Sequence, residues 1–379
     1  MTTSSPTPPT GTHLSADGGD ATAPERPATA PVPPKTPWIF HQGEFIRAGD
    51  LYMGPGLQGL HYGTGVFEGI RSYALPDPGT TPSAPPSGGA ESSGPDHGHD
   101  EPAAPGPYLF QAAEHYARLH RSCRLMRLDL PHSVPELVDI TAELLRRNGL
   151  TGHAYIRPVV HKLALQPGTP FGVRLSGVST ALTIMAMPMG AYVSRDGITC
   201  GVSSWRRIPD SSLPVNAKVT GGYANNALAV DEASAAGYDD AIMLNQRGEV
   251  AEASTANLFV VRDGQIATPH LGSDILPGLT RAVVIDLLAS EGGLRTAERT
   301  VLRSELHMAD EVFLTGTGCQ VVPVVTIDGR PVGDGVPGPV TRLVQELHHR
   351  AVSGQLPAYR HLNHPVALPT ARPGTDTRP

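Results

Sequence analysis

The chain has 379 residues, which is enough for two domains with large cores. Its prolines are concentrated, with nine in residues 1–37, nine in 74–107 and five in 357–379. We therefore expect a compact body with disordered tails at 1–37 and 357–379 and a disordered insertion at 76–107. This pattern excludes collagen, a coiled coil and a wholly disordered chain.

The formal net charge of −7 is a poor match for nucleic acid or an anionic membrane, both of which attract a basic surface. The sequence holds no apolar run of the roughly 20 residues that a membrane span needs, and its N-terminus lacks the apolar segment of a secretory signal. Three widely spaced cysteines, Cys123, Cys200 and Cys319, exclude a disulfide framework and indicate a reducing cytoplasm. The DHGHDE run at 96–101 lies inside the insertion, where nothing would hold a metal geometry, so we expect no metal.

The first half of the chain is expected to alternate strands and helices. Two apolar stretches, 65–75 and 107–110, flank the insertion, which therefore sits in a hairpin loop. Ser133 caps a helix that stops before Gly149. In order, we expect two short strands in 38–46 around Gln42-Gly43, strands at 65–75 and 107–110, helices at 111–127 and 133–148, and buried strands at 154–165 and 179–188.

The second half mixes strands and helices without a regular β-α-β alternation, which favours an α+β or mixed α/β fold over a Rossmann sheet. We place an interdomain linker at 188–197, between a small domain at 38–187 and a larger domain at 198–356. The elements expected here are a strand at 198–204, a helix at 222–236, hairpins at 241–253 and 257–268, a helix at 281–292, strands at 310–316 and 321–327, and a helix at 337–352.

Two charged residues lie among small or apolar neighbours. Lys218, in PVNAKVTGGYANN, is either a solvated surface lysine or a nucleophilic amine in an apolar pocket. Glu252, in GEVAEASTANLF, is either an exposed edge-strand residue or a buried carboxylate, which would need a cationic partner. Taken singly, each segment favours the solvated interpretation.

Three further features are suited to binding a phosphate. Leu279 and Thr280 follow Pro277-Gly278 at a helix start, where free N–H groups and the helix dipole attract anions. The Thr315–Gly318 turn adds backbone donors, and Arg118 lies on the 111–127 helix. The alternatives are an ordinary helix cap and a solvated arginine.

A lysine, a carboxylate, an arginine and phosphate-binding turns are together the parts of a pyridoxal-phosphate site. From Trp38 to about Val352 the chain resembles the class IV pyridoxal-phosphate-dependent aminotransferases, and within them it is most similar to branched-chain amino acid aminotransferases. The resemblance implies the two-domain fold-type IV architecture, like that of D-amino acid aminotransferase. The motifs that carry it are HYGTGVFEGIR (61–71), HYARLHRS (115–122), AYIRP (154–158), MPMGAYV (187–193), SSW with NAKVTGGY (203–223), EVAEASTANLF (249–259), ILPGLTR (275–281) and DEVFLTGTG (310–318).

The resemblance also implies roles for single residues. Lys218 becomes the catalytic Schiff-base lysine of a ping-pong mechanism, Glu252 pairs with the pyridine nitrogen, and Tyr223 flanks the cofactor. The phosphate would be held by Arg118, Leu279, Thr280 and Thr317. The substrate would be bound by Tyr62, Phe67, Tyr155, Arg157, Tyr192, Thr317, Gly318 and Cys319.

The implied reaction transfers an amino group between leucine, isoleucine or valine and 2-oxoglutarate, in an obligate homodimer because Tyr62 reaches the neighbouring subunit's site. Met189 and Gln320 depart from the family's usual tryptophan and acidic residue, which leaves the substrate range open. D-amino acid transaminases, (R)-selective amine transaminases and aminodeoxychorismate lyases are neighbouring alternatives with the same lysine and carboxylate. A non-catalytic binding protein of this fold is a further one, but the presence of both Lys218 and Glu252 argues against it.

Overall fold

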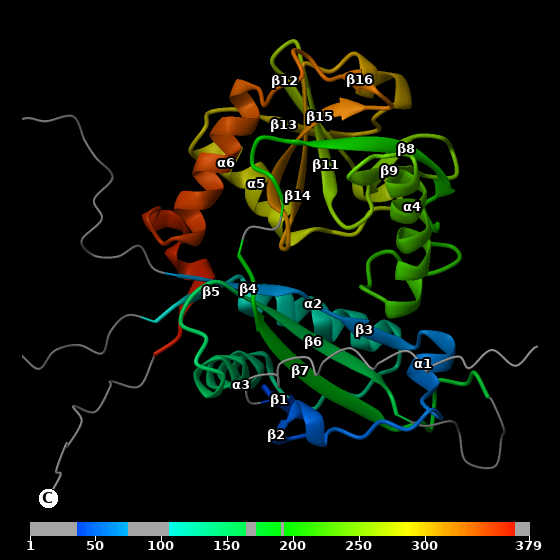
Figure 1. Cartoon of the computed structure of the whole chain (residues 1–379), viewed down its shortest axis with the longest axis vertical. Coiled ribbons are helices and arrows are strands. Elements are labelled where there is room, and N and C mark those ends of the chain that lie inside the picture. Colours follow the sequence, from blue (N-terminus) through cyan, green and yellow to red (C-terminus); the bar gives the residue numbers. More distant parts are fainter. Residues whose placement is uncertain (1–35, 75–105, 164–171, 191–192, 368–379) are drawn as a thin grey trace, which may run out of the picture. The chain divides into compact units, whose positions relative to one another are not determined.

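The computed structural model describes residues 36–74, 106–163, 172–190 and 193–367 (Figure 1). The first sheet is wholly antiparallel and takes its strands from the N-terminal half together with the last described strand. Its order is β17-β5-β4-β6-β7-β1-β2, and β3 pairs with β6. The strands are β1 (Trp38–His41), β2 (Glu44–Arg47), β3 (Gly65–Phe67), β4 (Ile70–Tyr73), β5 (Tyr108–Phe110), β6 (Ala154–Lys162), β7 (Thr180–Pro188) and β17 (Asn363–Pro365).

Helices α2 (Ala112–Leu125) and α3 (Val134–Arg147) pack against this sheet, and the short helix α1 (Gln58–Tyr62) precedes β3. Ser133 begins α3 with a capping box, because its hydroxyl accepts from the N–H of Glu136 while the Glu136 carboxylate accepts from the N–H of Ser133. Apolar side chains at helical spacing, such as Leu137 and Leu144, are fully buried against the sheet.

The second sheet is mixed, with the order β10-β9-β8-β15-β14-β11-β12-β13 and β16 paired to β15. The pairs β8–β9, β8–β15 and β12–β13 are parallel. Figure 1 shows α5 and α6 on one side of this sheet and α4 on another. The elements are β8 (Ile198–Arg206), α4 (Tyr223–Ala235), β9 (Asp240–Leu244), β10 (Val250–Ala253), β11 (Asn257–Arg262), β12 (Gln265–Pro269), α5 (Leu279–Ser290), β13 (Thr296–Arg299), β14 (Glu311–Gly316), β15 (Gln320–Ile327), β16 (Arg330–Pro331) and α6 (Pro339–Val352).

Local sequence patterns predict most of these elements correctly. The hairpin around the insertion is confirmed, since β4 and β5 pair antiparallel with Tyr73 opposite Tyr108. The hairpins β9–β10 and β11–β12 and the helices α2 to α6 also lie where expected. The short helix α1 and the strand β13 were not predicted.

Two expectations are wrong. The 65–75 segment is two strands, β3 and β4, which pair with β6 in the same register on either side of Glu68 and Gly69. The C-terminal tail does not begin at residue 357. A 3-10 turn at Pro357–Leu362 is followed by β17, which pairs with β5, because Tyr359 and Val366 bury apolar side chains.

Between Pro188 and Ile198 the chain passes from the first sheet to the second. The division into two domains at this segment stays a prediction. The insertion, apart from its last residues 106 and 107, and the tail at 1–35 lie outside the described residues.

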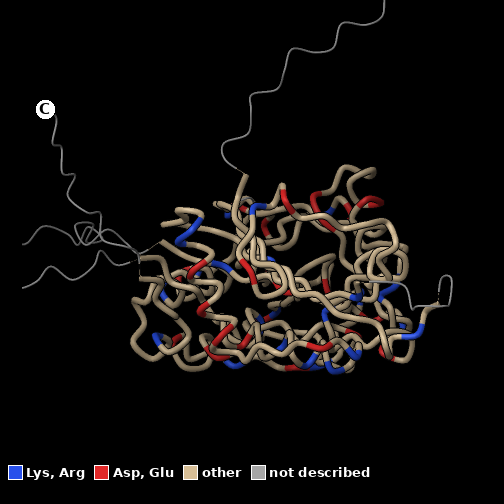
Figure 2. Tube along the Cα trace, turned by 90° about the horizontal axis from the view of Figure 1, so that it is seen from below, with Lys and Arg blue, Asp and Glu red and all other residues tan. Residues whose placement is uncertain are grey.

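None of the described helices is long and apolar enough to cross a membrane. Basic and acidic residues are interspersed along the described chain (Figure 2). Within the same residues, no group of three or more histidine, cysteine, aspartate or glutamate side chains could hold a metal ion.

Candidate active site

Lys218 lies on the segment between β8 and α4, and the first sheet holds its backbone in place. The N–H of Phe67 donates to the carbonyl of Lys218 at 3.1 Å, and the N–H of Lys218 donates to the hydroxyl of Ser122 at 3.2 Å. Next to the lysine, the backbones of Gly63 and Gly221 approach each other closely. Only glycine fits at position 63, because its φ is +62° and a Cβ there would overlap the backbone of Gly221. The lysine is therefore fixed where the two sheets meet.

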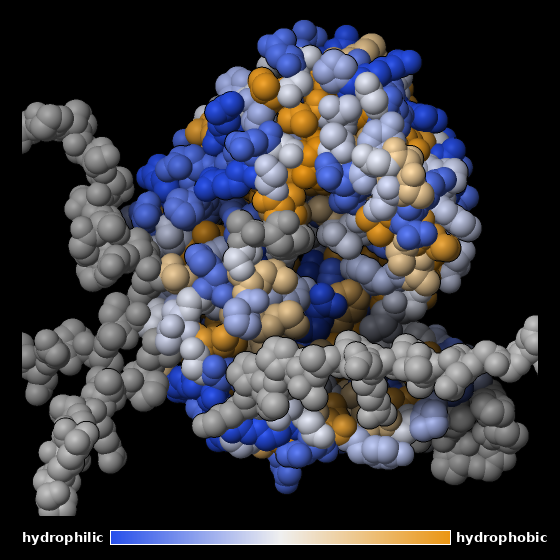
Figure 3. All heavy atoms as spheres, viewed as in Figure 1, coloured by the Kyte–Doolittle hydropathy of each residue, from blue (hydrophilic) through white to orange (hydrophobic). Residues whose placement is uncertain are grey.

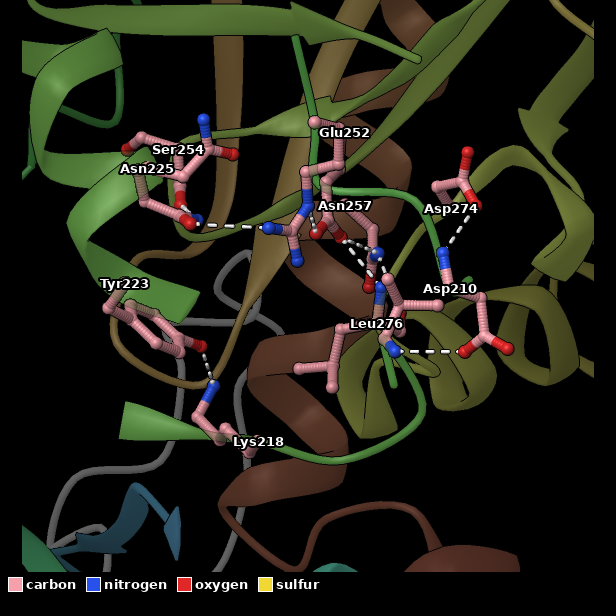
Figure 4. Close-up of polar contacts among 12 residues, drawn as sticks. Asp210, Lys218, Tyr223, Asn225, Glu252, Ser254, Asn257, Asp274 and Leu276 are labelled. Carbon is pink, nitrogen blue, oxygen red and sulfur yellow. Dashed lines mark hydrogen bonds and ion pairs between the residues drawn. The ribbon is translucent and has the colours of Figure 1, made fainter. Parts of the chain in front are cut away.

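The Lys218 amine points at an aromatic hydroxyl (Figure 4). Its Nζ donates to the Tyr223 hydroxyl at 2.7 Å and lies 5.1 Å from the centroid of the Phe67 ring. The rings of Phe67 and Tyr223 meet edge to face, with centroids 4.7 Å apart. The amine thus lies beside two aromatic rings and is oriented by its hydrogen bond to the Tyr223 hydroxyl.

Glu252 is buried on β10, as a carboxylate that needs a cationic partner would be. That partner is Arg207, whose Nε lies 2.8 Å from Oε1, while Oε2 accepts from Asn257 Nδ2 at 2.9 Å and from the N–H of Leu276 at 3.1 Å (Figure 4). Burial raises the pKa of Glu252, and the charge of Arg207 and the Leu276 N–H oppose that rise. Sequence reasoning missed Arg207 and Asn257, because nothing in the order of residues links them to Glu252.

The start of α5 offers unused backbone donors to the same cavity. The helix begins after Gly278 without a side-chain cap, so its first N–H groups have no intrahelical acceptor. Leu279 and Thr280 line the cavity together with Arg118 and Thr317. This end of the cavity is suited to an anion.

Arg118 is buried on α2 and held by Glu68. Its Nε and Nη2 donate to the two carboxylate oxygens at 2.6 and 2.8 Å, and Nη1 donates to the carbonyl of Pro277 at 2.8 Å. A guanidinium has five N–H donors, so two remain for a ligand. Burial opposes ionisation of Glu68, but the charges and hydrogen bonds of Arg118 and His115 hold its pKa well below its usual range.

Tyr155 and Arg157 lie two residues apart on β6, so both side chains are on the same face of the strand. Arg157 Nη2 donates to the Tyr155 hydroxyl at 2.8 Å, and its guanidinium carbon lies 4.6 Å from the centroid of the Phe67 ring. The Nε of Arg157 is buried and has no hydrogen-bond partner among the described residues.

These side chains line two adjoining volumes of about 40 and 260 Å³. The smaller contains Glu252 and the start of α5, and the larger contains Tyr155 and Arg157. Hydrophilic residues are visible in the hollow between the two sheet regions (Figure 3). Both volumes are lined by Arg118, Lys218, Tyr223, Thr255 and Thr317, and the larger also by Phe67, Met189, Gly318 and Cys319.

The structure thus brings together all but two of the site residues expected from the sequence. Tyr62, on α1, does not line either volume. Tyr192 lies outside the described residues. The roles of all these residues stay predictions, because their positions alone assign no function.

Comparison with known proteins identifies the architecture. A model of the family described as amino-transferase class IV matches residues 104–327. A probable branched-chain-amino-acid aminotransferase of Aquifex aeolicus (strain VF5) is 38% identical over 87% of this chain and 96% of its own length.

Two solved structures have the same fold. The branched-chain aminotransferase of Thermoproteus uzoniensis with norvaline matches with a TM-score of 0.76 and 34% identity, covering 87% of this chain and 99% of that one. The branched-chain amino acid aminotransferase of Thermobaculum terrenum in its PLP-bound holo form matches with a TM-score of 0.75 and 30% identity, covering 88% of this chain and 99% of that one. With its fold, its length and its sequence all matched, this chain belongs to the class IV aminotransferases.

Proposed function

We propose that this protein transfers the amino group of leucine, isoleucine or valine to 2-oxoglutarate, with pyridoxal 5'-phosphate as cofactor. The single observation that carries the proposal is the cavity in which Lys218, Glu252 and the uncapped start of α5 face one space. The relatives named above support the substrate class, since each is called a branched-chain aminotransferase and matches over most of this chain.

The residues present fit the cofactor. The uncapped N-terminus of α5 and the two unused donors of Arg118 suit a doubly charged phosphate, and the buried carboxylate of Glu252 suits a protonated ring nitrogen. When bound, pyridoxal phosphate supplies an aldehyde that an amine can attack and an electron-withdrawing ring. Leu279, Thr280, Thr317 and Tyr223 would complete the site.

Lys218 would act as the base that moves a proton at the substrate's Cα. A general base must be near its target, and the hydrogen bond of 2.7 Å from Nζ to the Tyr223 hydroxyl fixes where the amine lies in the cavity. Arg207 beside Glu252 opposes the rise of the Glu252 pKa that burial causes, which favours the carboxylate that would face a protonated ring nitrogen.

Tyr155, Arg157 and the Thr317–Cys319 turn would bind the substrate. Phe67 and Met189 give the larger volume apolar walls for a branched side chain. Arg157 lines the same volume, where its guanidinium can pair with the far carboxylate of 2-oxoglutarate or glutamate. One pocket can therefore accept both kinds of substrate in turn.

We also propose a cytoplasmic homodimer in which Tyr62 faces the partner's site. Tyr52 and Leu60, on the same segment, expose 87% and 70% of their surfaces, as residues at a subunit interface would in a lone chain. The free thiols of Cys123, Cys200 and Cys319 suit a reducing compartment. Sedimentation velocity of the holoenzyme should give a dimer, and a monomer would contradict this part of the proposal.

The test is a panel of amino donors with 2-oxoglutarate, measured on the holoenzyme. We expect leucine, isoleucine and valine to be used, and D-amino acids and (R)-amines to be poor donors. Lys218→Ala should abolish turnover while still retaining cofactor noncovalently. Asn216 is exposed on the same segment, and Asn216→Ala should keep the turnover of the wild type. A panel dominated by D-amino acids, or full activity in Lys218→Ala, would contradict the proposal.

A further inference from the structure

A second cavity, of about 200 Å³, adjoins the active site. It lies between β4, β15, α6 and the segment 193–195. Gly318 and Cys319 line both this cavity and the larger active-site volume, so this turn forms a shared wall. We call it the basic cavity, because its lining includes Arg71, His153, Arg195, His348 and His349.

Arg71 is the most deeply buried of these basic residues, with 2% of its surface exposed. Nη1 donates to the carbonyl of Gly318 at 2.9 Å, and Nη2 donates to those of Met189 and Gly190 at 2.9 and 3.0 Å. Its Nε is buried with no hydrogen-bond partner, and no described carboxylate pairs with the guanidinium. A buried charge normally has an opposite charge beside it, so the cavity next to Arg71 is suited to an anion.

The rest of the lining carries no opposing charge. The described residues that line the basic cavity include no aspartate or glutamate. Burial and the charges of His349, Arg71 and Arg195 lower the pKa of His348 to about 4. Burial and the charge of Arg71 also lower the pKa of His153. Burial is the larger cause of both shifts, and the charged groups that add to them are all basic residues.

The lining also indicates the chemical class of the anion. Val193, Val321, Val322 and Val352 give it an apolar side, which suits an aliphatic chain. A ligand ammonium would meet cations and no acidic acceptor, so an amino acid is disfavoured. We propose that the basic cavity is a second binding site for a small aliphatic carboxylate without an ammonium group, the chemical class to which branched 2-oxo acids belong.

An occupant would act on the active site through the shared wall. Arg71 holds the carbonyls of Met189 and Gly318, and both of these residues line the larger active-site volume. A carboxylate bound in the cavity beside Arg71 would change how firmly Arg71 holds the Gly318 turn. This effect on turnover rests on the proposed function, whereas binding itself does not.

The test uses calorimetric titration of the holoenzyme with 4-methylpentanoate, a branched carboxylate with neither an oxo nor an amino group. We expect two carboxylates per chain, one in each cavity. The double variant Arg195→Gln/His348→Gln should lose one of them, with at least tenfold weaker binding, because hydrogen bonds to charged groups contribute about 1.5–3 kcal/mol each. Arg342→Gln, on the outer part of α6, is the matched control and should keep both.

One carboxylate per chain in the wild type, or two in the double variant, would overturn the proposal. If the double variant does not fold, Arg195→Gln alone decides, since Arg195 is exposed and its loss should weaken the second site at least threefold. Binding of 3-methylbutylamine or of inorganic phosphate at that site with equal affinity would overturn the assigned chemical class.

Kinetics tests the coupling separately. 4-Methylpentanoate should inhibit with a noncompetitive component that the double variant lacks, and purely competitive inhibition of the wild type would overturn the coupling. Failure of the donor panel would contradict the proposed function but would leave the count of carboxylates per chain unaffected.

Discussion

The Glu252 carboxylate and the Arg207 guanidinium form an ion pair, with 2.8 Å between Oε1 and Nε, and only 6% and 11% of these side chains are exposed. Burial is the largest effect on the pKa of Glu252 and raises it. The charge of Arg207 opposes this rise and so offsets part of the cost of burying the carboxylate. Because Arg207 uses one carboxylate oxygen and Asn257 and Leu276 the other, the orientation of Glu252 is fixed before a ligand arrives.

Replacing Glu252 with Gln should lower kcat by about 10²-fold or more with a small change in melting temperature. A neutral amide cannot hold a protonated ring nitrogen, and each ~1.4 kcal/mol added to the barrier is tenfold in rate. Steady-state kinetics measures the change, with Glu249→Gln on the same hairpin as control. Unchanged kinetics in the Glu252 variant would show that the residue is structural.

Replacing Arg207 with Gln should move the acidic limb of the kcat profile to higher pH. Arg207 opposes the rise in the Glu252 pKa, so without it the carboxylate becomes protonated at a higher pH and its charge is lost. The measurement is kcat from pH 5 to 9 in both proteins. A uniform loss of rate at every pH would mean that Arg207 acts only on folding.

Replacing Glu68 with Gln should lower the free energy of unfolding by about 3 kcal/mol, because it leaves the buried Arg118 without its partner. Cofactor affinity should fall as well, since the guanidinium loses its fixed orientation. Chemical denaturation and cofactor titration measure the two effects, and Glu114→Gln on α2, the helix that carries Arg118, is the control. Loss of stability with unchanged cofactor affinity would show that Arg118 does not bind the cofactor phosphate.

The pH dependence of stability should contain a contribution from His348. Its folded pKa of about 4 lies below the ordinary value near 6.5, so the unfolded chain binds more protons between these values and stability falls as pH falls through that range. His348→Gln should remove this loss, which amounts to about 2 kcal/mol between pH 7 and 4.5. Urea denaturation without added carboxylate measures it, and the exposed His364→Gln should show no comparable effect.

Replacing Gly69 with Ala should raise the KM for the amino donor at least tenfold. A Cβ at this position would overlap the hydroxyl of Tyr155, which accepts from Arg157, so the pair would have to move. Cofactor affinity should be unchanged, because Glu252 and α5 are not involved. Gly56→Ala, where a Cβ meets nothing within 4 Å, is the control, and an unchanged KM in the Gly69 variant would remove Tyr155 from substrate binding.

Local patterns in the sequence determined most of the secondary structure. Ser133 with Glu136 determined where α3 starts, because a capping box lies within four consecutive residues. The apolar stretches around the insertion determined the β4–β5 hairpin in the same way. The motif around Lys218 also indicated the family, since several short motifs in the right order carry more information than any one of them.

Only the tertiary structure decided which charges meet. Glu68 and Arg118 are 50 residues apart, and Arg207 and Glu252 are 45 apart. Nothing in the order of residues reports such a pairing, because it is set by the sheets that carry the two side chains. For the same reason the sequence did not show that β17 completes the first sheet or that Arg71 is buried without a carboxylate. Local chemistry determined the elements, and long-range packing determined the electrostatics of the cavities.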